Sequence, residues 1–173
     1  MTPLERVVAR DEIRQLAYRY ALAIDSRDLD QLVALFVPDV RVGRDRSGRQ
    51  ALRASFEESL STIGVSILFV GNHIVDFEDD RHASGVVYCR GQIEAGEKWI
   101  EQAIQYRDRY ERRGEEWLFV RRDHLLWYGV ETAEQPLAQP PANWPEHHVG
   151  RGSLPGQDPS WQAFWAARPK RGD

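Results

Sequence analysis

The sequence predicts an α+β domain in which N-terminal helices pack into the concave face of a curved antiparallel sheet. Three observations support this prediction. Apolar residues recur every three or four positions in the first 60 residues, which is the pattern of helices with one buried face. From Val65 onward the period changes to two, and four long β-rich segments are separated by short turns. Strands of that length must twist and curl, so that helices on the concave side form a cone around a pocket.

The bulk composition excludes several classes of protein. The chain has 173 residues, which predicts one domain over residues 1–130 and an appended arm over residues 131–173. A net charge of −4 provides no basic excess for binding nucleic acid. The longest apolar run, Val65 to Val70, is too short to span a membrane, and the N-terminus lacks the apolar stretch of a signal peptide. A single cysteine, Cys89, is typical of a reducing cytoplasm.

The first helix is predicted from its capping residues and its periodicity. Thr2 followed by Glu5 forms a capping box, and apolar residues recur with helical spacing as far as Ile24. Asp11 is a second possible cap. Residues 3–24 therefore form either one helix or two.

A second helix is predicted directly after the first. Asp28 with Gln31 is another cap signature, and Pro38 ends the segment. A third helix is expected over residues 51–60, after a polar loop. Asp25 lies at the junction of the first two helices, where a side chain can project into a cavity.

The four predicted strands have simple turns between them. The turns contain clusters of acidic residues or glycine, such as Ala95-Gly96-Glu97. The expected strands cover residues 65–77, 82–93, 99–112 and 117–128. We expect aromatic residues on the outer face of the sheet, with Trp99, Tyr88 or their strand neighbours exposed there, and exposed aromatics of this kind usually meet a partner.

His73 and Asp25 are the first two candidate site residues. By alternation His73 shares a face with Gly71, Val75 and Phe77, which are small or apolar, so that this face is expected to point inward. A buried imidazole needs a partner for its N–H, and a carboxylate such as Asp25 is the strongest choice. The structural alternatives are a core histidine bonded to the backbone and an aspartate that caps the helix junction.

Tyr20 and Arg122 complete the candidate set. Tyr20 lies five residues before Asp25, and Arg122 alternates with Val120 and His124 along the last strand. A buried arginine is costly unless it meets a carboxylate or an anionic ligand. The alternatives are a core tyrosine with a satisfied hydroxyl group and an arginine that points to solvent at the rim.

The C-terminal arm differs in composition from the rest of the chain. Seven prolines prevent long regular structure over residues 131–173, but its aromatic residues make it too apolar for a free linker. We expect it to lie on the body or on a neighbouring subunit, with one short helix over residues 158–166. His147-His148 are interpreted as solvated side chains, and the sequence indicates no metal site and no cofactor.

The segment Tyr20 to Asp28 resembles the opening of SnoaL-like proteins of the NTF2-like superfamily, and Tyr110-Glu111-Arg112-Arg113-Gly114 resembles a later strand of the same group. The resemblance covers roughly residues 3–130. It implies an NTF2-like (cystatin-like) cone. Within the superfamily the pattern is most similar to hexachlorocyclohexane dehydrochlorinase, bile acid 7α-dehydratase and scytalone dehydratase.

This resemblance implies a set of roles. An acid at the end of the first helix pairs with a histidine on the sheet, and an arginine on the last strand serves the leaving group; the matching residues are Asp25, His73 and Arg122. The Asp–His pair is then the expected general base: His73 removes the proton from carbon, and Asp25 orients His73 and stabilises its charged form. Tyr20 holds the position of a further catalytic tyrosine. The expected function is that of a cofactor-independent lyase or isomerase acting on a small hydrophobic alicyclic or polycyclic molecule. A non-catalytic ligand-binding module and a polyketide cyclase remain alternatives. The resemblance favours a homotrimer over a dimer.

Overall fold

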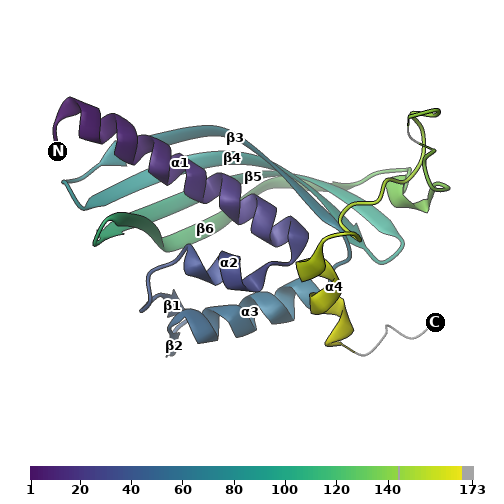
Figure 1. Ribbon diagram of the computed structural model, residues 1–173, viewed down its shortest axis with the longest axis horizontal. Helices are drawn as coiled ribbons and strands as arrows, with labels where there is room; N and C mark the ends of the chain where they lie inside the picture. The colour runs from purple at the N-terminus through teal and green to yellow at the C-terminus, as the bar shows by residue number, and fades with distance from the viewer. Residues whose placement is uncertain (144, 169–173) are drawn as a thin grey trace.

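The computed structural model describes residues 1–143 and 145–168; Trp144 and residues 169–173 lie outside the described part (Figure 1). The helices are α1 (Pro3–Ser26), α2 (Leu29–Ala34), α3 (Arg49–Ser61), the short 3₁₀ helix η1 (Pro136–Ala138) and α4 (Pro159–Ala166). The strands are β1 (Arg41–Val42), β2 (Arg46–Ser47), β3 (Ser66–Phe77), β4 (His82–Ala95), β5 (Lys98–Arg113) and β6 (Glu116–Glu131). In the described residues, no helix combines the length and the apolar character needed to cross a membrane.

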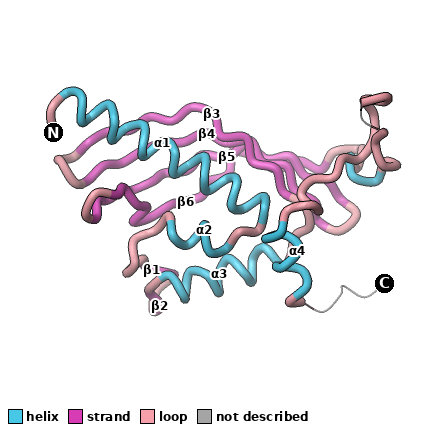
Figure 2. Tube along the Cα trace, viewed as in Figure 1, coloured by secondary structure: helices cyan, strands magenta, loops and turns pink. Residues whose placement is uncertain are grey.

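The main sheet is an antiparallel meander in the order β3-β4-β5-β6 (Figure 2). Two of its hairpin turns use glycine in the left-handed region, Gly96 at φ 65° and Gly114 at φ 64°, a conformation that costs glycine little. The sheet twists along its length, and α1 lies across one face of it, with α2 and α3 on the same side (Figure 1). The predicted α+β architecture, with helices on one face of a curved antiparallel sheet, is confirmed; the sheet does not close into a barrel.

Helix α1 is a single helix, which settles the alternative left open by Asp11. Thr2 and Glu5 form the predicted capping box, with each side chain accepting a hydrogen bond from the other residue's backbone N–H. The helix ends at Arg27, which takes a left-handed conformation at φ 59°. Such a conformation is unusual for a residue with a Cβ and reverses the chain sharply into α2. The Asp28 side chain then caps α2 by accepting the Gln31 N–H at 2.9 Å.

The core lies between α1 and the inner face of the sheet. Its centre is aromatic: Phe119 and Tyr110 are fully buried, and the ring centroids of Phe36 and Phe119 lie 5.1 Å apart. Helix α2 leads into this core because the backbones of Leu35, Val37 and Phe119 exchange hydrogen bonds at 2.9 Å. The helical layer therefore covers the first half of β6, around Phe119, whereas residues 124–131 of this strand are exposed.

Strand β3 carries a bulge that changes the expected alternation. The pairing with β4 shifts between Val70 and His73, so that Gly71 and Asn72 together interrupt the ladder. His73 and Val75 face inward as predicted, but Gly71 is exposed. The extra residue shifts the alternation of inward and outward side chains. A single period of two therefore does not describe the whole of β3.

The structure differs from the expectations at two further places. Trp99 is only 2% exposed, so its predicted exposure on the outer face is wrong. The chain leaving β6 runs beside it, and the Thr132 N–H donates to the Trp99 carbonyl at 2.9 Å. The second difference is β2, which pairs with β1 over the polar segment expected to be a loop.

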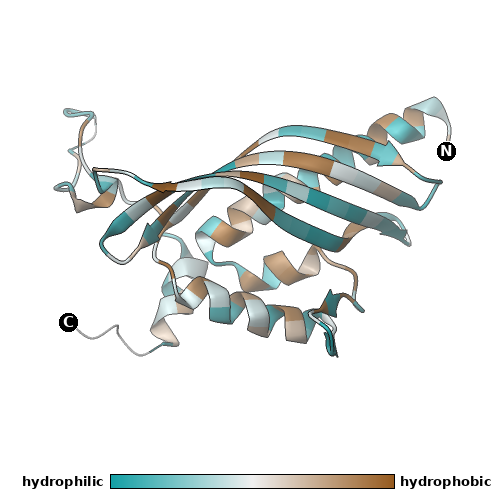
Figure 3. Cartoon of the chain, turned by 180° about the vertical axis from the view of Figure 1, so that it is seen from behind, coloured by the Kyte–Doolittle hydropathy of each residue, from teal (hydrophilic) through white to brown (hydrophobic). Residues whose placement is uncertain are grey.

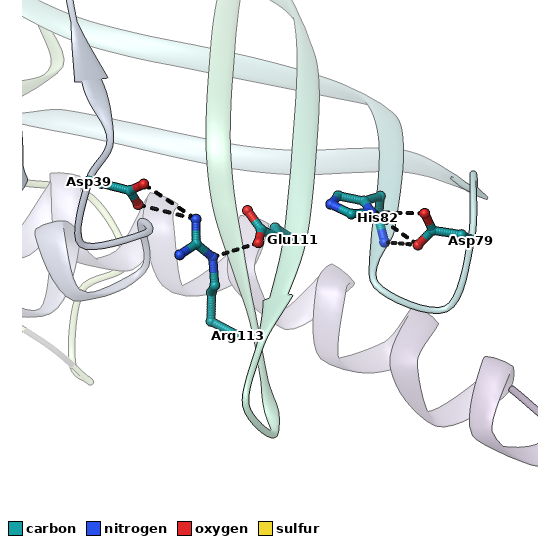
Figure 4. A network of polar contacts seen from close by, with 5 residues as sticks. All are labelled: Asp39, Asp79, His82, Glu111 and Arg113. Atoms are coloured by element: carbon teal, nitrogen blue, oxygen red, sulfur yellow. Dashed lines mark hydrogen bonds and ion pairs between the residues drawn. The ribbon is translucent and has the colours of Figure 1, made fainter.

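Surface ion pairs connect the loops at one end of the sheet (Figure 4). The guanidinium of Arg113 lies between two carboxylates, 2.6 Å from Glu111 and 3.3 Å from Asp39. In the β3–β4 turn, the Asp79 carboxylate accepts the His82 backbone N–H at 2.8 Å and contacts its imidazole. Exposed pairs of this kind contribute roughly 0–1 kcal/mol each, so they orient the turns more than they stabilise the fold.

Candidate active site

Asp25 lies in the last turn of α1 and points at the start of β3. One carboxylate oxygen accepts the Leu68 backbone N–H at 2.9 Å, and the other accepts the Ser66 hydroxyl at 3.0 Å. Burial raises the pKa of Asp25 to about 6, although these two hydrogen bonds and the charge of Arg27 act in the opposite direction. Asp25 is therefore a carboxylate that changes its charge close to neutral pH.

His73 belongs to a different polar network, on the same strand. Its Nε2 lies 3.0 Å from the Tyr110 hydroxyl, which donates its proton to Asp108 at 2.8 Å. Because that proton is committed to Asp108, Nε2 must be the protonated nitrogen of a neutral His73. Nδ1 then carries the lone pair, and it is buried with no hydrogen-bond partner in the described residues.

The other end of this network is the buried ion pair of Asp108 and Arg122. Arg122 Nε lies 3.1 Å from Asp108 Oδ1, and the two side chains are 4% and 0% exposed. The guanidinium carbon lies over three rings, 4.0 Å from the centroid of Tyr106, 4.4 Å from Tyr20 and 4.8 Å from Phe119. Within the part of the chain that the structure describes, neither terminal nitrogen of Arg122 has a hydrogen-bond partner.

The electrostatics of the network follow from its burial. Burial raises the pKa of Asp108, opposed by Arg122 and Tyr110. Burial also lowers the pKa of His73 to about 4, and the charges of Arg122 and Arg14 lower it further. His73 is therefore neutral at pH 7, and its protonated form is strongly disfavoured.

Tyr20 links the two parts of the site. Its ring packs edge-on against four aromatic rings and lies under the Arg122 guanidinium. It also packs against the apolar cluster that contains Ala23 and Ile24, at the end of α1 that carries Asp25. Burial raises the pKa of its hydroxyl group.

The Cys89 thiol on β4 lies near both Asp25 and Arg122. Burial raises the pKa of the Cys89 thiol to about 11, with Arg122 lowering and Asp25 raising it. The charges of Asp25 and Arg122 therefore both act on the Cys89 thiol, on the inner face of β4.

The structure brings Tyr20 and Arg122 together, but it does not bring Asp25 to His73. The hydrogen bond expected between these two side chains is not found among the described residues, where each has other partners. The Arg14 guanidinium lies 3.5 Å from the His73 carbonyl. Asp25 is eleven residues further along α1, a rise of about 16 Å. His73 on β3 therefore lies beside the middle of α1, whereas Asp25 lies at the C-terminal end of that helix.

Several residues of these networks were not predicted. Asp108 and Tyr110 follow Ile104 and Tyr106 at a spacing of two along β5, so an acid on an inward strand face was the available signal. Ser66 and Arg27 carry no comparable signal, because their roles depend on how α1 meets β3.

A hollow of about 690 Å³ opens where β6 meets the loop after α2. Its lining includes Arg122 but neither Asp25 nor His73. It is formed by Val37, Asp39, Val40, Arg41, Gly43, Arg109, Arg113, Val120, Arg121, Arg122 and Asp123. In residues 1–143 and 145–168, no three His, Cys, Asp or Glu side chains gather as a metal site would require.

Comparison with known proteins identifies the family. The sequence matches the SnoaL-like domain over residues 5–123, and no protein of curated function matches it. A putative scytalone dehydratase from Novosphingobium aromaticivorans has a similar structure, with 18% identity, 76% of this chain and 92% of that chain covered, and a TM-score of 0.65. A hexachlorocyclohexane dehydrochlorinase from Novosphingobium barchaimii has 19% identity, 76% and 95% coverage, and a TM-score of 0.69. At these identities the similarity shows a shared fold. Since the family match spans more than half of its length, the chain belongs to the SnoaL-like domain family.

Proposed function

We propose that the chain is a cofactor-independent lyase or isomerase. Its substrate is a small, largely apolar alicyclic or polycyclic molecule, which loses a proton from a carbon next to a carbonyl group. The observation that supports this most directly is the buried guanidinium of Arg122 with unpartnered terminal nitrogens. Buried donors without an acceptor are costly, and a substrate oxygen that gains negative charge would satisfy them.

Asp25 is the proton acceptor in this proposal. A general base works best when its pKa lies near the operating pH, and the pKa of Asp25 is raised to about 6. Its hydrogen bonds to Ser66 and Leu68 leave lone pairs on the carboxylate for the substrate proton. Tyr20 and Arg122 hold the oxyanion or the leaving group.

His73 has a supporting role. Its own use as the base, with Asp25 as its partner, requires a contact that this structure does not form, and a pKa of about 4 makes it a weak base. Through Tyr110 it instead helps to hold Asp108, the counter-charge of Arg122. We therefore assign His73 to the positioning of Arg122.

The names of the similar structures agree with this reaction class. A dehydratase and a dehydrochlorinase both perform eliminations, in which a proton leaves carbon and an anionic group leaves its neighbour. A polyketide cyclase would also remove a proton beside a carbonyl group, and product analysis would distinguish it from a lyase.

Hydrogen–deuterium exchange tests the proposal without knowledge of the natural leaving group. A panel of cyclic and polycyclic ketones is incubated with the protein in deuterated water, and exchange at the carbon next to the carbonyl is followed by NMR. We expect Asp25→Asn to reduce exchange by about 10²–10⁴-fold and His73→Ala to reduce it less. If His73→Ala abolishes exchange while Asp25→Asn retains it, His73 is the base and our assignment is wrong.

A non-catalytic ligand-binding module is the second candidate. It is favoured by the separation of Asp25 from His73 and by their absence from the lining of the hollow at Arg122. This candidate predicts that ketones of the panel bind, as measured by calorimetry, while the wild-type protein catalyses no exchange.

We also propose that the protein assembles with itself, as a trimer rather than a dimer. The outer face of the sheet has a hollow of about 550 Å³ lined by apolar side chains such as Phe69, Tyr88 and Trp127. Figure 3 shows apolar bands crossing this face. Patches of this kind usually meet a partner. Light scattering of wild-type protein and Trp127→Glu measures the assembly, and a wild-type monomer or dimer contradicts the proposal.

A further inference from the structure

Helix α4 lies beyond the segment that matches the family and packs against the end of α1 that carries Asp25 (Figure 1). Phe164 is buried among the apolar side chains around Ala23 and Ile24, and the Ser160 hydroxyl donates to the Ser26 carbonyl at 2.8 Å. The arm therefore reaches back to the site over more than 130 residues of sequence.

Arg27 is the point where α4 meets the site. Its side chain is buried, and its guanidinium donates to the carbonyl groups of Ile24 and Gly64. The guanidinium carbon lies 4.8 Å from the ring centroid of Trp161 and 5.9 Å from that of Phe164. Cation–π contacts of this kind are stronger when they are shielded from water. The rings of Trp161 and Phe164 thus cover one side of the Arg27 guanidinium.

A short hydrogen-bond chain leads from Arg27 to Asp25. Arg27 donates to the Ser66 oxygen at 3.0 Å, and Ser66 donates its own proton to Asp25 at 3.0 Å. Because the Arg27 N–H occupies a lone pair of the Ser66 oxygen, it favours the rotamer in which the hydroxyl points at Asp25. The charge of Arg27 also acts on Asp25 directly.

We propose that Arg27 is a positioning residue for the Asp25 carboxylate and that the aromatic rings of α4 hold Arg27 in this role. The inference rests on the proposed function of Asp25 as proton acceptor. It assigns to the C-terminal arm, which the family match does not include, a specific effect on the acid–base chemistry of the site. Through Arg27, the arm would then help to determine the pH range in which Asp25 is ionised.

The burial, hydrogen bonds and charges around Asp25 determine the direction of the expected effect. Burial raises its pKa, whereas the Leu68 N–H, the Ser66 hydroxyl and Arg27 lower it. Across the inner face, β4 contributes the Cys89 thiol, whose pKa of about 11 keeps it uncharged at neutral pH. Removal of Arg27 eliminates one of the opposing effects and weakens another, so the pKa of Asp25 should rise.

The test is a titration of Asp25 by carbon-detected NMR on protein labelled at aspartate carboxyl groups, with the signal assigned by Asp25→Asn. In Arg27→Met we expect the pKa of Asp25 to rise by about one pH unit, a tenfold change in its acid constant. Arg27→Lys restores the charge and should return part of the shift. Arg168→Met is the matched control, because Arg168 pairs with Glu57 and stacks on Phe164 without contacting Ser66.

Two further variants keep the test decisive if Arg27→Met does not fold. Ser66→Ala removes the connecting hydroxyl and should also raise the pKa of Asp25. Trp161→Leu removes the partly exposed ring over Arg27 and should raise it by a smaller amount. A folded Arg27 or Ser66 variant with an unchanged titration of Asp25 overturns the proposal.

This experiment separates the inference from the proposed function. The titration needs no substrate, so it can succeed even if Asp25→Asn retains full exchange activity, which would refute the role of Asp25 as the base. Conversely, loss of exchange in Asp25→Asn with no titration shift in Arg27→Met would leave the function standing and remove Arg27 from it.

Discussion

Replacement of Asp25 by asparagine should stabilise the protein at alkaline pH and destabilise it at acidic pH. The folded-state pKa of Asp25 is about 6, above the ordinary value of 3.8. The folded state therefore binds the proton more tightly than the unfolded state. Well below pH 3.8 both states are protonated and the carboxyl group costs little. As the pH rises through 3.8 towards 6, the unfolded state ionises first and the folded state loses stability; the cost is complete about one pH unit above 6.

The magnitude follows from the same values. A difference of about two pH units corresponds to about 3 kcal/mol of unfolding free energy at pH 8. Asparagine has one oxygen for the two donors that now meet the carboxylate, Ser66 and Leu68, so it loses one hydrogen bond worth about 1 kcal/mol. We expect Asp25→Asn to be about 2 kcal/mol more stable than the wild type at pH 8 and about 0.5 kcal/mol less stable at pH 4, where the wild type already carries a small part of the ionisation cost.

Urea unfolding at five pH values between 4 and 8 measures this difference. Asp30→Asn, which removes a carboxylate whose side chain is 89% exposed, provides the control for loss of a nearby surface charge. A stability difference between wild type and Asp25→Asn that stays constant from pH 4 to pH 8 would refute the reasoning. It would show that Asp25 titrates equally in both states.

Three further predictions concern the buried network. Arg122→Met should cost about 3–5 kcal/mol by urea unfolding, because it leaves Asp108 buried without a counter-charge, and adding Asp108→Leu should recover most of the loss. Tyr110→Phe should cost about 1–3 kcal/mol, because it leaves an oxygen of Asp108 and Nε2 of His73 without their partner, and nitrogen NMR of His73 should show an altered tautomer balance. Gly85→Ala should lower the melting temperature at a cost of about 1–3 kcal/mol, because the new Cβ would lie 3.0 Å from a backbone carbonyl and 3.1 Å from the Tyr110 hydroxyl.

Each of these predictions has a contrary outcome. A double variant at Arg122 and Asp108 that is as unstable as Arg122→Met would mean that the lost stability comes from packing instead of an unpaired charge. An unchanged tautomer balance in Tyr110→Phe would mean that the hydroxyl does not set the protonation of His73. A melting temperature of Gly85→Ala equal to the wild type would mean that β3 shifts away at no cost.

Much of the fold could be predicted because its signals are local. The Thr2 capping box, the Asp28 cap and the switch to a period of two each depend on residues within a few positions of one another. The predicted strands differ from the observed ones by at most three residues at either end. The two-residue strand β2 was missed, because a pair of polar residues has no periodicity.

The outer face was predicted less well than the core. Tyr88 is exposed as expected, and its ring packs edge-on against Trp127. Trp99 has the alternation of an outer-face residue but is buried, since the chain after β6 runs beside it. Alternation shows on which face of the sheet a residue lies. Whether another segment covers that residue depends on the path of the C-terminal arm.

By itself, the sequence determined the α+β class, the order of its elements and the presence of Asp25, His73, Tyr20 and Arg122 on buried elements. Only the tertiary structure decided their partners. The Leu68 amide bound by Asp25 is 43 residues away in sequence, and the Tyr110 hydroxyl bound by His73 is 37 residues away. Such pairings depend on the sheet register, on the bulge in β3 and on the position of α1 along that strand. These are set by packing over the whole domain, and no pattern of neighbouring residues records them.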